Sequence, residues 1–119
     1  MFDRYTEDAR KIIFFARYEA SRHGSLVLEP EHLWLGLLRQ SKRLIKRHAP
    51  LVTVESIQAR LLRRGLETAR VSMTVELPLS EVTARAIQGA TTEADAHGQK
   101  HITAEHLLLA LLREENSAI

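Results

Sequence analysis

The chain has 119 residues, of which 45% are hydrophobic and 27% charged, so it is long enough for one domain with a real core and too apolar for wholesale disorder. It contains no cysteine, which excludes disulfides, thiolate metal sites and cysteine nucleophiles, and its low aromatic content of 5% favours a helical protein over a β-sandwich. The formal net charge of +2 hides a basic segment, Arg39–Arg64, whose eight basic residues and one acid give it a charge of +7.

The N-terminus carries charges where a secretory signal peptide needs an apolar stretch, because its first residues read MFDRYTEDARK. No stretch of the sequence approaches the roughly 18 apolar residues of a membrane-spanning helix. We therefore expect a cytoplasmic protein without a membrane segment.

The sequence repeats itself with a shift of 74 positions. Under this shift residues 5–39 align with residues 79–113 without a gap, and 14 of the 35 pairs are identical. Chance does not keep register over such a length, so the chain is a tandem duplication. We expect a single domain, residues 1–119, made of repeat one (1–65), a linker (66–78) and repeat two (79–119).

Each repeat opens on a predicted helix. Thr6 and Ser80 are suited to cap these helices, because their hydroxyls can accept from the free N–H groups of the first turn. Gly24 and Gly98 end them, since glycine tolerates a left-handed conformation after a helix. The residues between follow helical spacing with an alanine-rich apolar face, which predicts close helix–helix approach: Ala9, Ile12, Ile13, Ala16 and Ala20 in repeat one, and Thr83, Ala86, Ile87, Ala90 and Ala94 in repeat two.

A second helix follows in each repeat, within the matching strings EPEHLWLGLLR and TAEHLLLALLR. Pro30 suits the first helical position of one, and Thr103 is the expected cap of the other. The runs LWLGLL and LLLALL are apolar all round, so both helices should be central and buried. For His32 and His106 we expect hydrogen bonds that join loop to helix.

Two more helices are predicted between the copies, over Lys42–His48 and Val54–Arg64. The stretch VSMTVELP after them alternates and contains Pro78, which indicates an extended linker. Repeat two has no counterpart of these helices before the sequence stops, so it looks incomplete. We expect their absence to leave apolar surface on repeat two.

The basic segment has two interpretations. It can be a solvated helix face, or it can attract an acidic partner such as a nucleic acid over a Debye length. The residues available for such contact are Lys42, Arg43, Lys46, Arg47, Arg60, Arg63 and Arg64.

No motif predicts catalysis, a cofactor or a metal site. Neither Glu-His string is followed by a nucleophile or a second carboxylate at usable spacing, and the five glycines form no phosphate-binding loop. His97 and His101 are four residues apart, but Gly98 lies between them, so they do not share one helical face. We predict that the protein is not an enzyme.

Binding of a charged group is the hypothesis that remains for the two glutamates. Glu31 and Glu105 fall in the first turn of their helices, beside N–H groups that suit a phosphate or carboxylate. A ligand with both a cation and an anion, such as a phosphorylated guanidinium, would suit this combination. The alternative is simple complementation of the helix dipole, worth about 0.3–1 kcal/mol, with no ligand at all.

Taken together, the opening MFDRYTEDARKII, the His-Gly helix ends and the two [PA]EHLxLxLLR strings resemble the Clp N-terminal repeat domain of Clp/Hsp100 AAA+ unfoldases. The resemblance implies an all-α, pseudo-twofold bundle with no catalytic activity, which binds substrates or adaptor proteins and passes them to an ATPase ring. The chain departs from the family in its basic segment, in its short second repeat and in the absence of ATPase modules.

The resemblance also implies a recognition site. In some members the glutamate of the motif takes part in binding phosphoarginine on tagged substrates, which carries over to Glu31 and Glu105, with Thr6 and Ser80 at nearby helix caps. We expect Glu31→Ala combined with Glu105→Ala to keep the helical fold and weaken partner binding. The alternative function is nucleic-acid binding through Arg39–Arg64.

Overall fold

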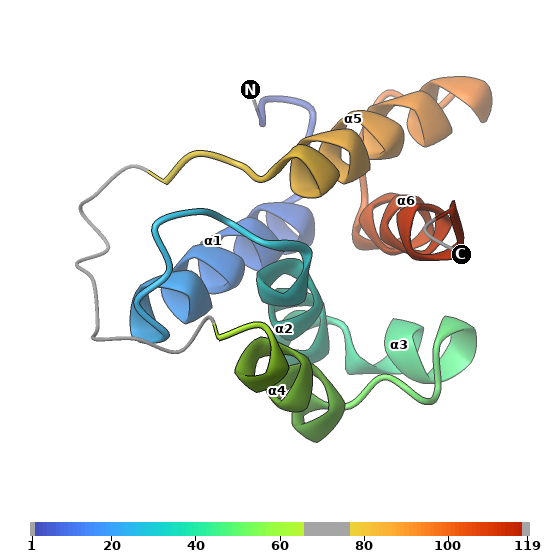
Figure 1. Cartoon of the computed structure of the whole chain (residues 1–119). Helices are drawn as coiled ribbons and strands as arrows, with labels where there is room; N and C mark the ends of the chain where they lie inside the picture. Colours follow the sequence, from blue (N-terminus) through green and yellow to red (C-terminus); the bar gives the residue numbers. More distant parts are fainter. Residues whose placement is uncertain (1, 66–76, 118–119) are drawn as a thin grey trace.

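The structure, a computed structural model, describes residues 2–65 and 77–117 and is built of helices. In chain order these are α1 (Glu7–Arg22), α2 (Pro30–Gln40), α3 (Lys42–His48), α4 (Val54–Arg63), α5 (Glu81–Ala96) and α6 (Ala104–Ser117) (Figure 1). No described helix combines the length and the apolar character that crossing a membrane requires. The all-α prediction is confirmed. The linker predicted for 66–78 lies outside the described residues except for its last two positions.

The first helices of the two repeats begin and end as predicted. The Thr6 hydroxyl accepts from the N–H of Ala9 at 3.2 Å, and the Ser80 hydroxyl accepts from Thr83 at the same distance. After α1 and α5 the chain turns at Gly24 and Gly98, whose φ angles of 72° and 64° lie in the left-handed region that glycine adopts readily. The predicted apolar faces of both helices are buried.

The second helix of repeat one, α2, lies near the centre of the molecule, and α6 lies to its right (Figure 1). In α2 every residue from Leu33 to Leu38 is buried, which confirms the prediction for this helix. In α6 Leu107, Leu108 and Leu111 are buried, while two of its leucines are half-buried. Each of these two helices packs mainly against the first helix of its own repeat, α2 on α1 and α6 on α5.

The two repeats are joined by backbone pairing that the 74-residue shift relates. Leu28, before α2, pairs in parallel with Leu79, before α5, and Tyr5 pairs in the same way with Ile102. The shift converts Tyr5 into Leu79 and Leu28 into Ile102, so one bridge is the symmetry copy of the other. The pseudo-twofold arrangement is therefore confirmed in the backbone. The segment before the first helix of each repeat therefore pairs with the segment before the second helix of the other repeat.

The described helices of the two repeats differ in number. The described residues after Ser80 form α5 and α6, whereas repeat one continues into α3 and α4; α4 ends at Arg63 rather than at the predicted Arg64. The expectation of apolar surface on repeat two is wrong for the described residues. Their exposed large hydrophobic side chains all belong to repeat one: Phe14, Leu26, Leu51, Val54 and Leu62. The reason is that α1, α2 and α3 of repeat one all pack on α6.

Close approach of α1 and α2 depends on Gly36. A methyl group at this position would lie 2.5 Å from the carbonyl oxygen of Ile12 and 3.2 Å from the backbone nitrogen of Ala16. Backbone atoms cannot swing aside as a side chain can, so the helices would have to separate. We expect Gly36→Ala to lower the free energy of unfolding by about 1–3 kcal/mol, although alanine favours a helix by about 1 kcal/mol. Urea unfolding followed by circular dichroism measures this.

Gly89→Ala is the matched control, because a methyl group there would lie 3.2 Å from the Cβ and 3.9 Å from the Cα of Ala110, which is much less crowded than the 2.5 Å contact at Gly36. Its gain in helix propensity should offset this crowding and leave stability nearly unchanged. A Gly36→Ala protein as stable as the unmodified chain would contradict the close packing of α1 on α2.

Candidate functional site

The histidines of the two repeated strings hold the loop–helix junctions. The Nδ1 atom of His32 accepts from the N–H of Glu29 at 2.9 Å, and His106 accepts from Thr103 at the same distance. This confirms the structural interpretation of both residues. His32 is fully buried, and burial together with the nearby His23 and Arg64 lowers its pKa to about 4. Burial and His97 likewise lower the pKa of His106.

Nothing in the described part of the chain gathers three or more His, Asp or Glu side chains in a way that could hold a metal ion. The Nδ1 atoms of His23 and His97 lie 2.8 and 2.9 Å from the carbonyl oxygens of Glu19 and Glu93, one turn back in their own helices. These contacts stabilise the C-terminal ends of α1 and α5.

Glu31 is a buried carboxylate at the centre of a partly exposed ion cluster, which we call the Glu31 cluster: Glu29, Glu31, Arg60, Arg64 and Glu115. The side chain of Glu31 is only 3% exposed and accepts from Arg60 at 3.1 Å and from Arg64 at 2.5 Å. Arg60 also donates to both carboxylate oxygens of Glu115, at 2.7 and 3.4 Å. Since Glu31 is on α2, Arg60 on α4 and Glu115 on α6, the cluster ties three helices and both repeats together.

Glu115 was not among the residues predicted from the sequence to form a site. It lies in the polar end of α6, 55 residues from Arg60, and the indole N–H of Trp34 donates to it at 3.0 Å. Its role follows only from the packing of α6 beside α2 and α4.

The Glu31 cluster changes the interpretation of the basic segment. Arg60 and Arg64 are paired with carboxylates, and Arg39 lies over the rings of Phe15 and Tyr18 at 4.4 and 5.5 Å. The predicted patch is therefore not continuous. Besides Arg39, the basic side chains of the segment that stay exposed without an ion pair to a described residue are Lys42, Arg43, Lys46, Arg47 and Arg63.

Glu105 has a different environment from Glu31, although the 74-residue shift relates them. Its side chain is 47% exposed, and one oxygen lies 3.3 Å from Nε2 of His48 on α3. No arginine of the described residues pairs with it. The two glutamates thus have separate environments: Glu31 is buried and paired with two arginines, whereas Glu105 is half-exposed to solvent.

The helix caps bring the starts of helices from different repeats together. The N–H of Thr6 donates to the carbonyl of Ile102 at 3.0 Å, which sets the start of α1 beside the start of α6 and three residues before Glu105. The N–H of Ser80 donates to Leu28 at the same distance, which sets the start of α5 beside α2. Thr6 is thereby associated with Glu105, and Ser80 with Glu31, in two symmetry-related positions instead of one shared groove.

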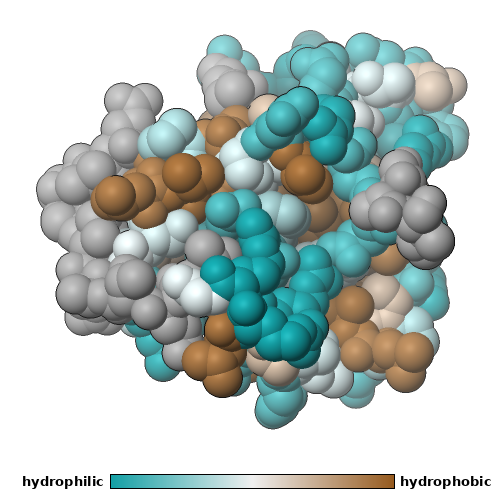
Figure 2. Space-filling view, viewed as in Figure 1, coloured by the Kyte–Doolittle hydropathy of each residue, from teal (hydrophilic) through white to brown (hydrophobic). Residues whose placement is uncertain are grey.

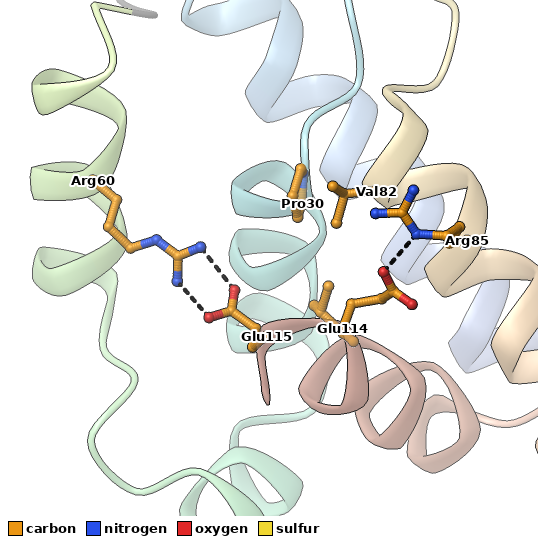
Figure 3. Close-up of a pocket in the computed structure, with 7 residues that line it drawn as sticks. Pro30, Arg60, Val82, Arg85, Glu114 and Glu115 are labelled. Atoms are coloured by element: carbon orange, nitrogen blue, oxygen red, sulfur yellow. Dashed lines mark hydrogen bonds and ion pairs between the residues drawn. The ribbon is translucent and has the colours of Figure 1, made fainter. Parts of the chain in front are cut away.

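Two cavities lie where the repeats meet. One of about 450 Å³ is bounded by the start of α2, the start of α5 and the end of α6, with Arg60, Glu115, Arg85 and Glu114 around it (Figure 3). As Figure 3 shows, Arg60 pairs with Glu115 and Arg85 with Glu114, so the charges at this cavity are already balanced within the chain. The second, of about 480 Å³, is mainly apolar and is lined by Phe2, Ile13, Arg17, Leu28, Leu77, Pro78 and Leu79.

Comparison with known proteins identifies one family. The profile of the family described as the Clp repeat (R) N-terminal domain matches residues 4–119. The chain is 31% identical, over 115 residues and 96% of its length, to the chloroplastic chaperone protein ClpC2 of Oryza sativa subsp. japonica. It has the same identity and coverage with the ATP-dependent Clp protease ATP-binding subunit ClpA homolog of Guillardia theta. The chain spans only 12% and 14% of the lengths of these two relatives.

Solved structures share the fold. The N-terminal domain of the caseinolytic protease associated chaperone ClpD from Arabidopsis thaliana superposes with a TM-score of 0.74 at 24% identity, covering 93% of this chain and 77% of that one. The Hsp104 N-terminal domain from Candida albicans gives a TM-score of 0.70 at 22% identity, covering 96% of this chain and 77% of that one.

Proposed function

Because the chain belongs to the family of Clp repeat N-terminal domains, we propose that it is a non-catalytic module that binds protein substrates or adaptor proteins for a Clp-type ATPase. The observation that carries this proposal is the open environment of Glu105, a first-turn acid that is 47% exposed beside the start of a helix from the other repeat. Such a position offers a carboxylate and free backbone N–H groups to one ligand.

The ligand chemistry that we propose for this position is phosphoarginine on a protein. Its phosphoryl group would accept from the N–H groups at the starts of α1 and α6, near Thr6, and its guanidinium would donate to Glu105. Both parts carry charge, so the hydrogen bonds would be stronger than those of a neutral side chain. A lone phosphate lacks the cation and would be repelled by Glu105.

The symmetry-related position at Glu31 and Ser80 is closed in our proposal. The place that a guanidinium ligand would take at Glu31 is held by Arg60 and Arg64 of the same chain. A ligand at Glu31 would have to displace two ion pairs. We therefore propose that phosphoarginine binds at Glu105 and Thr6 in preference to Glu31 and Ser80.

The apolar cavity of about 480 Å³ supplies the second part of the proposed mechanism. It is bounded by the paired segments of Leu28 and Leu79, where the two repeats meet. An unfolded protein exposes apolar side chains that a cavity of this size can accept, because ligand sites commonly measure about 300–1,000 Å³. Phosphoarginine would then bind at Glu105, and the apolar side chains of the unfolded protein would bind at a separate site, in this cavity.

The ATPase itself lies outside the 119 residues of this chain. We propose that the module serves a Clp ATPase that either continues this chain or is a separate subunit, since the curated relatives are about eight times longer. A cytoplasmic location is part of this proposal. It rests on the sequence alone, since the rice relative is a chloroplastic protein and does not support it.

Titration with free phosphoarginine tests the proposal. We expect binding by calorimetry and an affinity loss of about tenfold or more for Glu105→Gln, because a neutral amide cannot form a charge-assisted bond with the guanidinium. Glu105 is half-exposed, so the glutamine variant should keep its helical spectrum and its melting temperature.

Arginine and inorganic phosphate, titrated separately, are the controls for the two halves of the ligand, and both should bind more weakly than phosphoarginine. Equal binding by the unmodified protein and Glu105→Gln would contradict the site. Absence of phosphoarginine binding would remove the ligand from the proposal, and binding of unphosphorylated unfolded casein would then test the apolar cavity alone.

A further inference from the structure

The exposed cations of the basic segment are concentrated on α3. This short helix is anchored by Ile45, which is 2% exposed, while Lys42, Arg43, Lys46 and Arg47 all reach solvent. None of these four forms an ion pair with a residue that the structure describes. Four uncompensated charges within seven residues repel one another, and an acidic partner would relieve that repulsion.

Two of these cations border an apolar cavity. A hollow of about 300 Å³ lies between α2, α3 and the start of α4, with Leu38, Ile45, Val52 and Val54 in its wall and Lys42 and Lys46 beside them. Its size is at the small end of ligand pockets and suits one or two large side chains. In the turn next to it Leu51 is 90% exposed. Figure 2 shows hydrophobic residues at the lower right of the molecule, in the region of α3.

A second hollow continues this one along α2. It measures about 400 Å³ and shares Leu38, Lys42 and Val54 with the first. We call the two together the α3 groove. The charged residues along the α3 groove are four basic and two acidic, which leaves it net positive: Arg22, Arg39, Lys42, Lys46, Glu19 and Glu55.

We propose that the α3 groove binds an acidic protein segment that carries one or two large aliphatic side chains. The aliphatic side chains would enter the apolar floor at Leu38 and Val54, and the carboxylates would pair with Lys42 and Lys46. This partner differs from the proposed ligand of Glu105, which is defined by a phosphoryl group and a guanidinium. The surface belongs to α1, α2, α3 and α4 of repeat one. The described part of repeat two holds no copy of α3 and α4, so one segment would bind per chain.

A protein segment fits this surface better than a nucleic acid does. Single-stranded nucleic acids bind through positive grooves with aromatic side chains on which the bases stack. The α3 groove has an aliphatic floor and no aromatic residue in its lining. A phosphate backbone would gain nothing from covering Leu38 and Val54, whereas leucine or isoleucine side chains would bury apolar area there.

The test uses a fluorescein-labelled synthetic peptide in which two leucines are set among aspartates and glutamates, with fluorescence anisotropy as the readout. We expect saturable one-to-one binding that weakens as salt rises, because the charges are at the surface. Replacing both leucines by serine should weaken binding about tenfold, and replacing the acids by their amides should weaken it at least as much.

Two charge-reversed proteins separate groove binding from general attraction. Lys42→Glu with Lys46→Glu should weaken peptide binding about tenfold or more, whereas Arg43→Glu with Arg47→Glu changes the net charge equally on the same helix but should weaken it about threefold or less. Circular dichroism confirms that each variant is folded, and Glu105→Gln should bind the peptide as the unmodified chain does.

Three results would overturn the proposal. One is equal loss in the two charge-reversed proteins, and another is binding that does not depend on the leucines, because both indicate attraction without a groove. The third is tighter binding of a single-stranded RNA of the same length than of the peptide, which would make the basic helix a nucleic-acid surface.

Discussion

Glu31→Ala is expected to lower the free energy of unfolding by about 2–4 kcal/mol. Breaking a buried ion pair by removing one partner commonly costs about 3–5 kcal/mol, because the other charge is left without compensation. Here the carboxylate is 3% exposed, but Arg60 and Arg64 are 27% and 44% exposed and regain some hydration, which reduces the cost. Chemical unfolding of both proteins at neutral pH, followed by circular dichroism, measures the difference.

Glu105→Ala is the symmetry-matched control for this measurement. The same residue type at the equivalent helix position pairs with His48 and is 47% exposed, so its removal should cost less than about 1 kcal/mol. Equal stability losses in the two variants would contradict the burial of Glu31. Arg64→Ala should show part of the same loss and should not add fully to Glu31→Ala, since the two side chains form one ion pair.

This expectation revises what the sequence suggested for the two glutamates. The repeat makes Glu31 and Glu105 equivalent, and from the repeat alone we predicted that substituting both would keep the helical fold. The difference between them arises from Arg60, Arg64 and Glu115, which lie at least 29 residues from Glu31 in the sequence and follow no local pattern. Assays of Glu31 variants must therefore first separate loss of binding from loss of folded protein.

Contacts between residues distant in sequence also limited what could be predicted of the fold. Local signals were sufficient for the caps at Thr6 and Ser80 and for the glycine ends of both helices, because each depends on residues within one or two turns. The pairing of Leu28 with Leu79 and of Tyr5 with Ile102 was not predictable, because it joins segments that are distant in sequence. Which repeat covers the apolar face of α6 follows from that pairing, and so the expected exposed surface on repeat two was wrong.

The pH dependence of stability is the second large effect that we expect, and it comes from His32. The folded chain holds this imidazole neutral, since its side chain is fully buried, its Nε2 atom has no hydrogen-bond partner among the described residues, and its ring lies 6.4 Å from that of His23. Burial is the main cause that lowers the pKa of His32 from 6.5 to about 4, and the charges of His23 and Arg64 add to it.

The sign follows from which state binds the proton. Between pH 6.5 and about 4 the unfolded chain protonates this histidine while the folded chain does not, so stability is complete above pH 6.5 and is lost as the pH falls toward 4. A pKa difference of this size corresponds to about 3 kcal/mol over the whole window. Unfolding free energies measured at a series of pH values across it give the slope.

His32→Gln isolates this contribution from the carboxylates that titrate in the same range. Glutamine at the third position of a helix can still accept from the N–H before the helix, so the junction at Glu29 is kept while the titrating ring is removed. We expect a clearly flatter pH dependence for His32→Gln. His106→Gln, the symmetry-matched control, should flatten it less, because the nearby Glu105 and Glu93 oppose the lowering of the pKa of His106. If the two glutamine variants keep the full slope of the unmodified chain, the buried imidazole of His32 is not the source of the acid sensitivity.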